Sequence, residues 1–225
     1  MFEAEAEGLR ELARTGAIRV PKVEQVGIEN GQAFISMERI ERSTRESADA
    51  KLGEQLARLH HATSAHFGWH RDNTIGLTPQ KNDACDNWIV FFREHRLRYQ
   101  LALLGIQTPL LDRLEPFFEG HDPEPSLLHG DLWGGNWFTA SSGEPVIFDP
   151  ACYYGDREAD IAMTYLFGGF GPAFYDAYEA AWPLNEGHHR RRDLYNLYHV
   201  LNHANLFGGG YLRQAREMIE KLAQL

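Results

Sequence analysis

The stretch Leu127–Pro150, LLHGDLWGGNWFTASSGEPVIFDP, determines how the rest of the sequence is interpreted. An apolar run and a His-Gly pair lead into Asp131, and Asn136 follows five residues later. The segment between Asn136 and Asp149 is predicted to form two short strands joined by a turn at Ser-Ser-Gly. A hairpin of this kind folds the chain back and places its last residue beside its first. We therefore expect three oxygen-bearing side chains to converge on one point.

These residue types suit magnesium-assisted phosphoryl chemistry. Hard cations such as Mg²⁺ prefer carboxylate, amide and phosphate oxygens, so the three converging side chains suit a Mg²⁺ ion that also binds phosphate. An unpaired carboxylate at Asp131 can accept a hydroxyl proton, or orient the hydroxyl for in-line attack on phosphorus. Gly134 and Gly135 are expected to keep the loop narrow where backbone and phosphate approach each other. The competing interpretation is that all three polar residues only cap turns or end a strand.

The spacing is that of kinase-like phosphotransferases, in which a catalytic loop of the form HxDxxxxN precedes a metal-binding aspartate. A lone DxxxxN is common by chance. The combination of His-Gly-Asp, the asparagine spacing, a hairpin and an aspartate that ends an apolar strand is not. The sequence therefore favours a phosphotransferase over the purely structural interpretation.

Composition excludes several other classes of protein. The chain has 225 residues, with 22 Lys and Arg against 32 Asp and Glu, a formal net charge of −10. This acidic balance argues against nucleic-acid and anionic-membrane partners, which require a basic face. No apolar run approaches the roughly 20 residues of a membrane span, and the first residues lack the apolar core of a signal peptide. Two cysteines are too few for a disulfide framework, so a cytoplasmic location is the default.

The hydrophobic pattern predicts an α+β organisation. A helix over 2–15 precedes strands at 23–28 and 32–37, joined by an Asn-Gly turn that tolerates left-handed backbone. A polar linker at 41–47 leads into a larger, mostly helical part with a long loop at 62–87, a length that suggests a role over a site. Helices are expected in that part at 48–61, 88–104, 110–119, 158–166, 173–181, 189–206 and 211–223.

Longer stretches resemble one family in particular. The segments at 129–137 (HGDLWGGNW), 147–170 (IFDPACYYGDREADIAMTYLFGGF), 194–211 (LYNLYHVLNHANLFGGGY) and 75–100 are similar to the fructosamine kinase family. The similarity runs from Phe2 almost to the C-terminus, so it is far more specific than the catalytic loop alone. It implies a protein-kinase-like two-lobe fold that uses ATP and Mg²⁺. The reaction implied is phosphorylation of a sugar hydroxyl on a ketoamine, a small-molecule or protein-bound fructosamine or ribulosamine, as a step in protein deglycation.

The resemblance also implies a nucleotide site. Glu38 and Ile40 would offer backbone groups to adenine in the hinge, and Met37 would line the back of the pocket. Glu5 resembles the helix glutamate that pairs with the ATP-binding lysine. Carried onto the matching positions, the resemblance implies that Asp131 is the catalytic base and that Asn136 and Asp149 hold Mg²⁺.

Other residues have both a functional and a structural interpretation. Trp133 either packs on the sugar of the acceptor or holds the catalytic loop as a wedge. Asn73 and Gln80, in the long polar loop, either bind the acceptor or serve turns. His129 and Asp160 are expected to support the catalytic loop rather than take part in the chemistry.

The resemblance implies one part that the sequence does not show. The fold builds its nucleotide lobe from about five strands, the first three carrying a Gly-rich loop and a lysine. Those three strands need roughly 25–35 residues, yet the sequence starts at the following helix, and its first lysine, Lys22, comes after that helix. We expect an incomplete N-lobe at 1–40, a helical C-lobe at 41–225 and impaired activity, whether the start is a mis-assigned methionine or a real truncation.

Further expectations follow from this organisation. The two remaining strands would expose an unpaired edge, which predicts self-association or instability through residues 23–37. Another small-molecule kinase, for an aminoglycoside or choline-like acceptor, is an alternative, although it should not share LFGGF and NLFGGGY. A non-catalytic, pseudokinase-type binding module is a second alternative, which the absent lysine favours and the intact catalytic loop disfavours.

Overall fold

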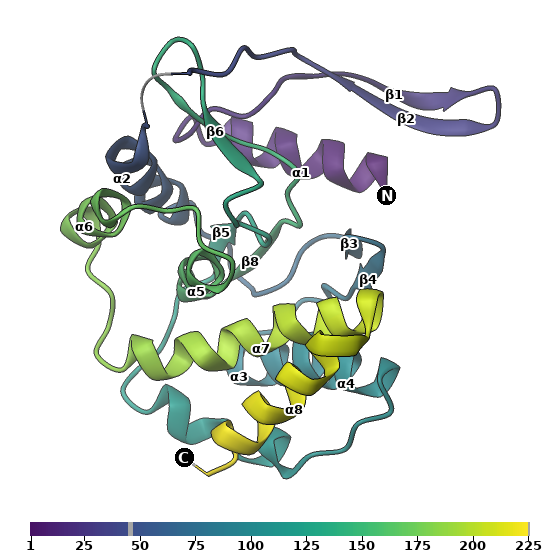
Figure 1. Cartoon of the computed structure of the whole chain (residues 1–225), viewed down its shortest axis with the longest axis vertical. Coiled ribbons are helices and arrows are strands. Elements are labelled where there is room, and N and C mark those ends of the chain that lie inside the picture. Colours follow the sequence, from purple (N-terminus) through teal and green to yellow (C-terminus); the bar gives the residue numbers. More distant parts are fainter. Residues whose placement is uncertain (45–46, 225) are drawn as a thin grey trace.

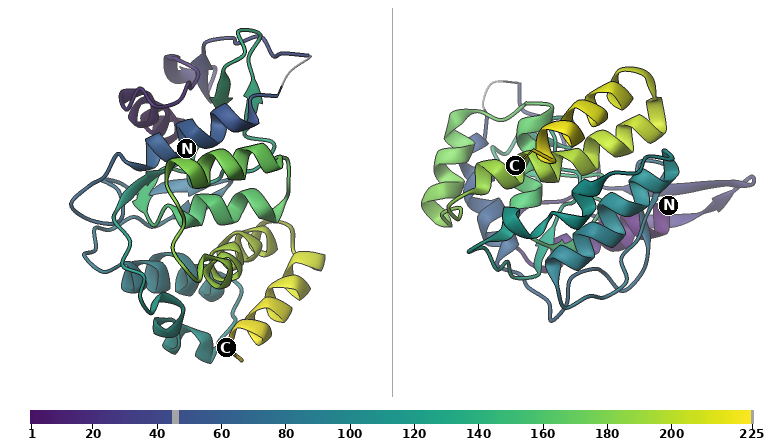
Figure 2. Two further views of the ribbon diagram at one scale, coloured as in Figure 1. Left: turned by 90° about the vertical axis from the view of Figure 1, so that its left-hand side faces the viewer. Right: turned by 90° about the horizontal axis from the view of Figure 1, so that it is seen from below.

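The hairpin and the first helix form one end of the molecule. The computed structural model describes residues 1–44 and 47–224. Helix α1 (Phe2–Arg14) buries Leu9 and Leu12, as its pattern predicts. Strands β1 (Val23–Glu29) and β2 (Gln32–Met37) pair antiparallel, with left-handed backbone at both residues of the Asn-Gly turn, as expected. Figures 1 and 2 show this hairpin projecting beyond the body of the molecule.

Helices α2 (Asp49–His60) and α6 (Pro172–Ala181) pack closely on each other. A Cβ atom at Gly53 would lie 2.1 Å from the carbonyl oxygen of Phe174, so this contact requires glycine. The two helices share a hydrophobic core with α1 (Figure 1). The predicted linker at 41–47 includes residues 45 and 46, which lie outside the described residues. The part of the linker before residue 45 pairs with the hairpin that follows Asn136, through a β-bridge between Arg42 and Ala140.

Four short strands frame the catalytic segment. Strand β5 (Ser126–Leu128) enters it and pairs antiparallel with β8 (Tyr153–Gly155), which leaves it. Between them, β6 (Trp137–Thr139) and β7 (Pro145–Ile147) form the predicted hairpin. The β6–β7 pair is therefore nested in sequence inside the β5–β8 pair. Together they hold the ends of the loop that contains Asp131 and Asn136 and of the segment that contains Asp149. The β5–β8 pair was not predicted.

The loop predicted at 62–87 contains a small hairpin, β3 (Asn73–Ile75) and β4 (Thr78–Gln80). The helix predicted at 110–119 is wrong. Two 3₁₀ turns, at Pro109–Asp112 and Glu115–Phe118, occupy that region. Pro116 explains the break, because proline lacks an N–H and disfavours helical backbone in the residue before it.

The helix predicted at 88–104 divides into three parts. A π-helical segment, Phe92–Arg98, separates α3 (Trp88–Phe91) from α4 (Tyr99–Leu103). This segment carries the buried Arg96, whose guanidinium carbon lies 4.0 Å from the centre of the Tyr153 ring. A buried cation stacked on an aromatic ring explains why an arginine occupies this helix interior.

The other end of the molecule is helical. Helix α5 (Glu158–Leu166) packs on α7 (His188–Phe207), and α8 (Gly209–Leu222) folds back along α7 (Figure 1). These helices match the expected ranges to within two residues. A second hydrophobic core, rich in aromatic side chains, lies between α7, α8 and the α3–α4 region. No helix in the described ranges is long and apolar enough to span a membrane.

Candidate active site

The backbone that leads into Asp131 is held by a buried carboxylate. Asp160, on α5, accepts hydrogen bonds from the backbone N–H groups of His129 (2.7 Å) and Gly130 (2.8 Å). Burial opposes the ionised form of Asp160, but the hydrogen bond from His60 helps to hold its pKa below the ordinary value. The carboxylate is thus an anionic anchor for two consecutive peptide groups.

The His129 side chain connects this loop to the segment that contains Asp149. Its Nε2–H donates to the carbonyl oxygen of Phe148 (2.9 Å), and its Nδ1 accepts from the Asp131 N–H (3.3 Å). Burial lowers the pKa of His129, so the imidazole is neutral and can both donate and accept. Both expected support residues therefore contact the catalytic loop directly.

Gly130 lies where two functional segments cross. Its φ is +82°, and a Cβ atom there would lie 2.1 Å from the carbonyl oxygen of Ala151. The backbone N–H of Ala151 donates to the His129 carbonyl oxygen (2.9 Å) at the same crossing. Left-handed backbone and the absence of a side chain are both needed, so the Gly of the His-Gly-Asp sequence is a structural requirement.

The carboxylate of Asp131 faces a cavity without a bonded partner. About 21% of the side chain is exposed, and no hydrogen bond to either carboxylate oxygen is found within 1–44 and 47–224. Burial, and then the negative charges of Asp149 and Asp160, raise the pKa of Asp131 to about 7. A proton acceptor works best with a pKa near the operating pH, so this environment suits a general base.

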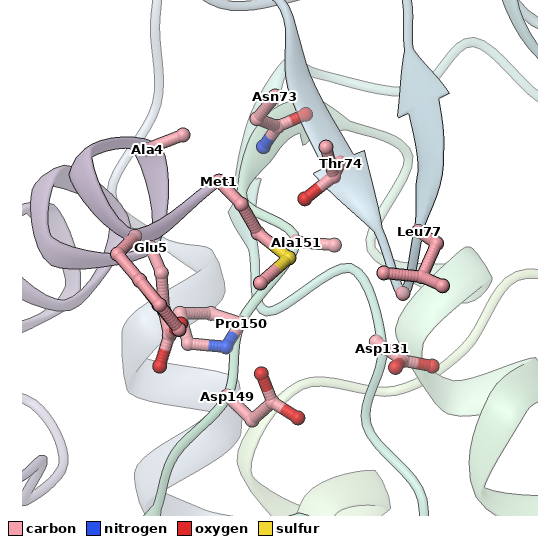
Figure 3. Close-up of a pocket in the computed structure, with 12 residues that line it drawn as sticks. Met1, Ala4, Glu5, Asn73, Thr74, Leu77, Asp131, Asp149, Pro150 and Ala151 are labelled. Carbon is pink, nitrogen blue, oxygen red and sulfur yellow. The ribbon is translucent and has the colours of Figure 1, made fainter. Parts of the chain in front are cut away.

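Asn136 and Asp149 line the same cavity as Asp131. Asp149 has left-handed backbone (φ +57°), which is unusual for a residue other than glycine. The side-chain N–H groups of Asn136 donate to the carbonyl oxygens of Asp131 (2.9 Å) and Asp149 (3.5 Å), so its amide oxygen remains available. Figure 3 shows the carboxylates of Asp131 and Asp149 at the edge of the adjoining cavity. A carboxylate and an amide oxygen beside an open space fit a magnesium ion that also binds phosphate.

The glycines at 134 and 135 serve packing in this structure. A Cβ atom at Gly135 would lie 2.3 Å from the Trp133 ring, and one at Gly134 would lie 2.8 Å from the Gly168 carbonyl oxygen. The loop is therefore narrow so that the indole and the 168–169 backbone can pack on it. This contact is a more direct reason for the glycine pair than the expected approach of a phosphate.

The residues expected to bind nucleotide divide into two groups. Glu5 lies with Asp149 along a cavity of about 280 Å³ (Figure 3). Burial and the charge of Asp149 raise the pKa of Glu5, and no ion pair to it occurs in the described part of the chain.

The hinge residues 37–40 lie outside the cavity that Glu5 lines. The N–H of Glu38 donates to the Lys22 carbonyl oxygen (2.8 Å), while the Glu38 carbonyl and the Ile40 N–H have no partner among the described residues. Met37 packs partly buried on the core beneath the hairpin.

The acceptor side does not match every expectation. Trp133 is 40% exposed and lines a cavity of about 360 Å³ with the three polar side chains. Gln80 is buried and donates to Asn73 (2.8 Å) and to the Ala151 carbonyl oxygen (3.0 Å). The amide of Asn73 donates to the Cys152 carbonyl oxygen (2.8 Å). These side chains are used in fastening β3 and β4 to the segment after Asp149, so we propose a supporting role for both in place of acceptor binding.

Comparison with known proteins identifies the family. The model of a family described as fructosamine kinase matches residues 1–225. The chain belongs to the fructosamine kinase family. It is 47% identical over 235 residues to a "Probable ketoamine kinase" of Synechocystis, covering 100% of this chain and 79% of that protein. It is 46% identical over 233 residues to a chloroplastic protein-ribulosamine 3-kinase of Arabidopsis thaliana, covering 98% of this chain and 71% of that protein.

Solved structures confirm the fold class. A protein assigned as a fructosamine-3-kinase from Haemophilus somnus superposes with a TM-score of 0.91 at 32% identity, covering 99% of this chain and 79% of that one. A choline/ethanolamine kinase family protein from Mesorhizobium loti gives a TM-score of 0.61 at 14% identity, covering 99% and 78%, and shares the fold alone. This fructosamine kinase family member therefore has a protein-kinase-like fold and is a phosphotransferase, as predicted.

Sequence reasoning missed one wall of the cavity that Asp131 and Trp133 line in this fructosamine kinase family member. Helices α7 and α8 contribute His203, Phe207 and Tyr211, and Phe167 follows α5. The His203 ring lies 4.8 Å from Phe167, 5.6 Å from Phe207 and 5.0 Å from Tyr211, between ring centres. The spacing of 203 and 207 is a local signal for one face of α7, whereas Tyr211 lies on α8 and reaches this wall through the turn at Gly208.

A second polar cluster lies away from the active site of this kinase. His121, Asp156 and Glu158 are the three metal-type side chains that cluster in the described chain. Their donor atoms are already in use, because Nε2–H of His121 donates to Asp156 (2.6 Å) and Arg191 donates twice to Glu158 (2.7 and 3.0 Å). The Arg191 guanidinium supplies the positive charge that a metal ion would otherwise bring to this cluster. The cluster is therefore a buried ion-pair network.

Proposed function

We propose that this chain transfers the γ-phosphate of ATP to a sugar hydroxyl of a ketoamine, a fructosamine or ribulosamine carried by a small molecule or a protein. The observation that carries the proposal is one shared cavity. It is lined by the Asp131 carboxylate, which has no hydrogen-bond partner among the described residues, and by the side chains of Asn136 and Asp149, which both carry oxygen atoms. Relatives 45–47% identical are named ketoamine kinases and protein-ribulosamine 3-kinases, which supplies the acceptor class. The likeness to choline and aminoglycoside kinases extends to the fold alone.

We propose a role for each polar group. Asp131 accepts the proton of the attacking hydroxyl and orients its oxygen toward phosphorus. The amide oxygen of Asn136 and the carboxylate of Asp149 would hold Mg²⁺, which neutralises phosphate charge when it is bound. Asp160 and His129 keep the loop in place, so the base does not move when the acceptor enters.

We propose that residues 1–40 are the nucleotide-facing part of the molecule, an incomplete N-lobe on the C-lobe of residues 41–225. The free carbonyl of Glu38 and N–H of Ile40 would bind adenine, with Met37 behind them. Glu5 has no basic partner among the residues described, so phosphate positioning by a lysine is not provided by this part of the chain. Turnover of these 225 residues alone is therefore expected to be low.

Aromatic rings line the acceptor side. We propose that the sugar of the ketoamine packs on Trp133 and that its amine lies near Phe167, Phe207 and Tyr211. Aromatic faces attract a protonated amine without adding a second base to the site. This arrangement suits an acceptor that combines a sugar hydroxyl with a nearby ammonium group.

Activity with a ketoamine tests the proposal. Release of ADP from Mg²⁺-ATP is expected with a fructosamine or ribulosamine, but not with an aminoglycoside or choline. A form that carries about 40 further residues upstream should be the faster enzyme. Turnover with an aminoglycoside and none with either ketoamine, in both forms, would overturn the acceptor assignment.

We propose self-association through β1 and β2. They form a two-stranded sheet with exposed edges, and the Ile28 side chain is 77% exposed. Sedimentation velocity is expected to show concentration-dependent association that Ile28→Lys weakens and Leu103→Lys, at a separate exposed leucine, does not. A monomer at every concentration would contradict the proposal.

The net charge of the chain bears on its macromolecular partners, and its two cysteines bear on its location in the cell. The formal charge of −10 supports a molecule without nucleic-acid or membrane partners. Cys85 and Cys152 are both free, and we propose a cytoplasmic location on that basis.

A further inference from the structure

His199 presents an unused nitrogen to the catalytic carboxylate. The residue lies within α7 and is 4% exposed. Its Nδ1 is buried and has no hydrogen-bond partner in the ranges that the structure describes. The same atom lies 4.0 Å from Oδ1 of Asp131. A buried polar atom without a partner carries a free-energy cost, so its position beside the active site requires an explanation.

Within the described residues the Asp131 carboxylate also lacks a hydrogen-bond partner, so two complementary groups face each other unpaired. A distance of 4.0 Å is beyond the usual hydrogen-bond range, and a shift of about 1 Å would close it. Asp131 lines the acceptor cavity and His199 does not. The imidazole therefore approaches the carboxylate from within the protein and leaves its other side open to an acceptor hydroxyl.

We propose that His199 is a positioning residue for Asp131: its Nδ1–H donates to Oδ1, and this bond directs the second carboxylate oxygen toward the acceptor hydroxyl. The proposal rests on the proposed function, because it gives Asp131 the role of base. A hydrogen bond to one oxygen restrains the rotation of a carboxylate that has no other hydrogen bond within the described residues. A correctly oriented base transfers a proton at a higher rate than a rotating one.

The environment of His199 keeps its imidazole uncharged. Burial, reinforced by His203, lowers the pKa of His199 to about 3. A neutral imidazole has one N–H, which can point to Asp131 without bringing a positive charge beside it. A cation at that position would stabilise the ionised carboxylate and make it a weaker base.

Neighbouring bonds fix His199 relative to the active site. The hydroxyl of Tyr198 donates to the side-chain oxygen of Gln80 (2.7 Å), and Gln80 donates to the Ala151 carbonyl oxygen (3.0 Å). The backbone carbonyl of His199 accepts from Nδ1 of His203 (2.8 Å). The helix is thus attached to the segment that follows Asp149, so the distance between the imidazole and the loop is constrained.

Nitrogen NMR of the whole chain tests the contact without any need for turnover. With ¹⁵N-labelled histidine, His199 is expected as the Nδ1–H tautomer, and its Nδ1 signal should move in Asp131→Asn. A Nε2–H tautomer, or a signal that does not respond to Asp131→Asn, would overturn the proposal. Since ADP release is not measured, a confirmed contact together with no ketoamine activity, both in this chain and in the form extended upstream, would refute the proposed function alone.

Kinetics of substituted chains test the consequence. His199→Leu removes the donor and is expected to lower kcat about 10- to 100-fold with the KM for ATP unchanged. His199→Asn places an amide N–H near the position of Nδ1 and should restore most of the rate. His121→Asn is the matched control, because His121 is also buried but bonded through both ring nitrogens away from the site. Folded His199→Leu with the wild-type kcat, or an equal loss in His121→Asn, would contradict the positioning role.

Discussion

Asp131→Asn is expected to lower kcat by about 10²- to 10⁴-fold while the protein stays folded. Asparagine keeps the size of the side chain and removes the proton acceptor. The carboxylate has no hydrogen-bond partner in the described part of the molecule, so little structure depends on it. Burial, and then repulsion from Asp149 and Asp160, disfavour the ionised carboxylate and raise its pKa, and the neutral amide avoids both costs. The melting temperature should therefore be unchanged or higher.

Single-turnover rates with Mg²⁺-ATP and a ketoamine, together with thermal unfolding, separate these effects. Asp86→Asn is the control, because that side chain is 86% exposed and pairs only with His66 among the described residues. It should retain the wild-type rate. An Asp131→Asn protein that is folded and equally fast would refute the role of Asp131 as base.

Gly130→Ala is expected to destabilise the fold by about 3–5 kcal/mol. A left-handed residue other than glycine costs about 1–3 kcal/mol. The added methyl group would also lie 2.1 Å from the Ala151 carbonyl oxygen, a backbone atom that cannot move without disturbing the segment after Asp149. Thermal unfolding should show a fall in melting temperature of the order of 10 °C, and activity should fall as the crossing of the two loops opens.

Gly143→Ala isolates the backbone contribution. Gly143 has φ +81°, close to the +82° of Gly130, but nothing lies within 4 Å of a Cβ atom there. Its replacement should cost about 1–2 kcal/mol. Equal losses of unfolding free energy in Gly130→Ala and Gly143→Ala would show that the clash with the Ala151 carbonyl oxygen adds nothing to the cost of the substitution.

The convergence of Asp131, Asn136 and Asp149 on one cavity could be predicted because these residues are near one another in sequence. Asp131 and Asn136 belong to one loop, and the Asn136–Asp149 separation is spanned by a short hairpin with a clear turn signal. Local spacing was therefore enough to bring the three side chains to one cavity. Helix α1 and its hairpin were likewise predicted, since amphipathic spacing and an Asn-Gly turn are local signals.

Features that depend on long-range contacts could not be predicted. The β5–β8 pair joins segments about 25 residues apart across the whole site, and each strand has only three residues. The packing of α7 brings His199 and the aromatic wall close to Asp131. No local sequence pattern predicts that packing. Gln80 looks like a polar loop residue, and its side chain is satisfied in the interior by the Ala151 carbonyl oxygen and the Tyr198 hydroxyl, both of which are far away in sequence.

One error had a local signal. Pro116 lies within the segment predicted as a helix at 110–119, where the apolar spacing was given more weight than the proline. Two 3₁₀ turns bury Leu110, Leu111, Phe117 and Phe118 with the same spacing, so hydrophobic periodicity alone could not distinguish them from one helix.

Phosphorus NMR of the acceptor after incubation with Mg²⁺-ATP tests ketoamine phosphorylation most directly. A phosphomonoester signal coupled to a proton on a sugar carbon of the ketoamine is expected, and it should be absent with Asp131→Asn. An unmodified ketoamine alongside a phosphorylated aminoglycoside or choline would contradict the proposed reaction.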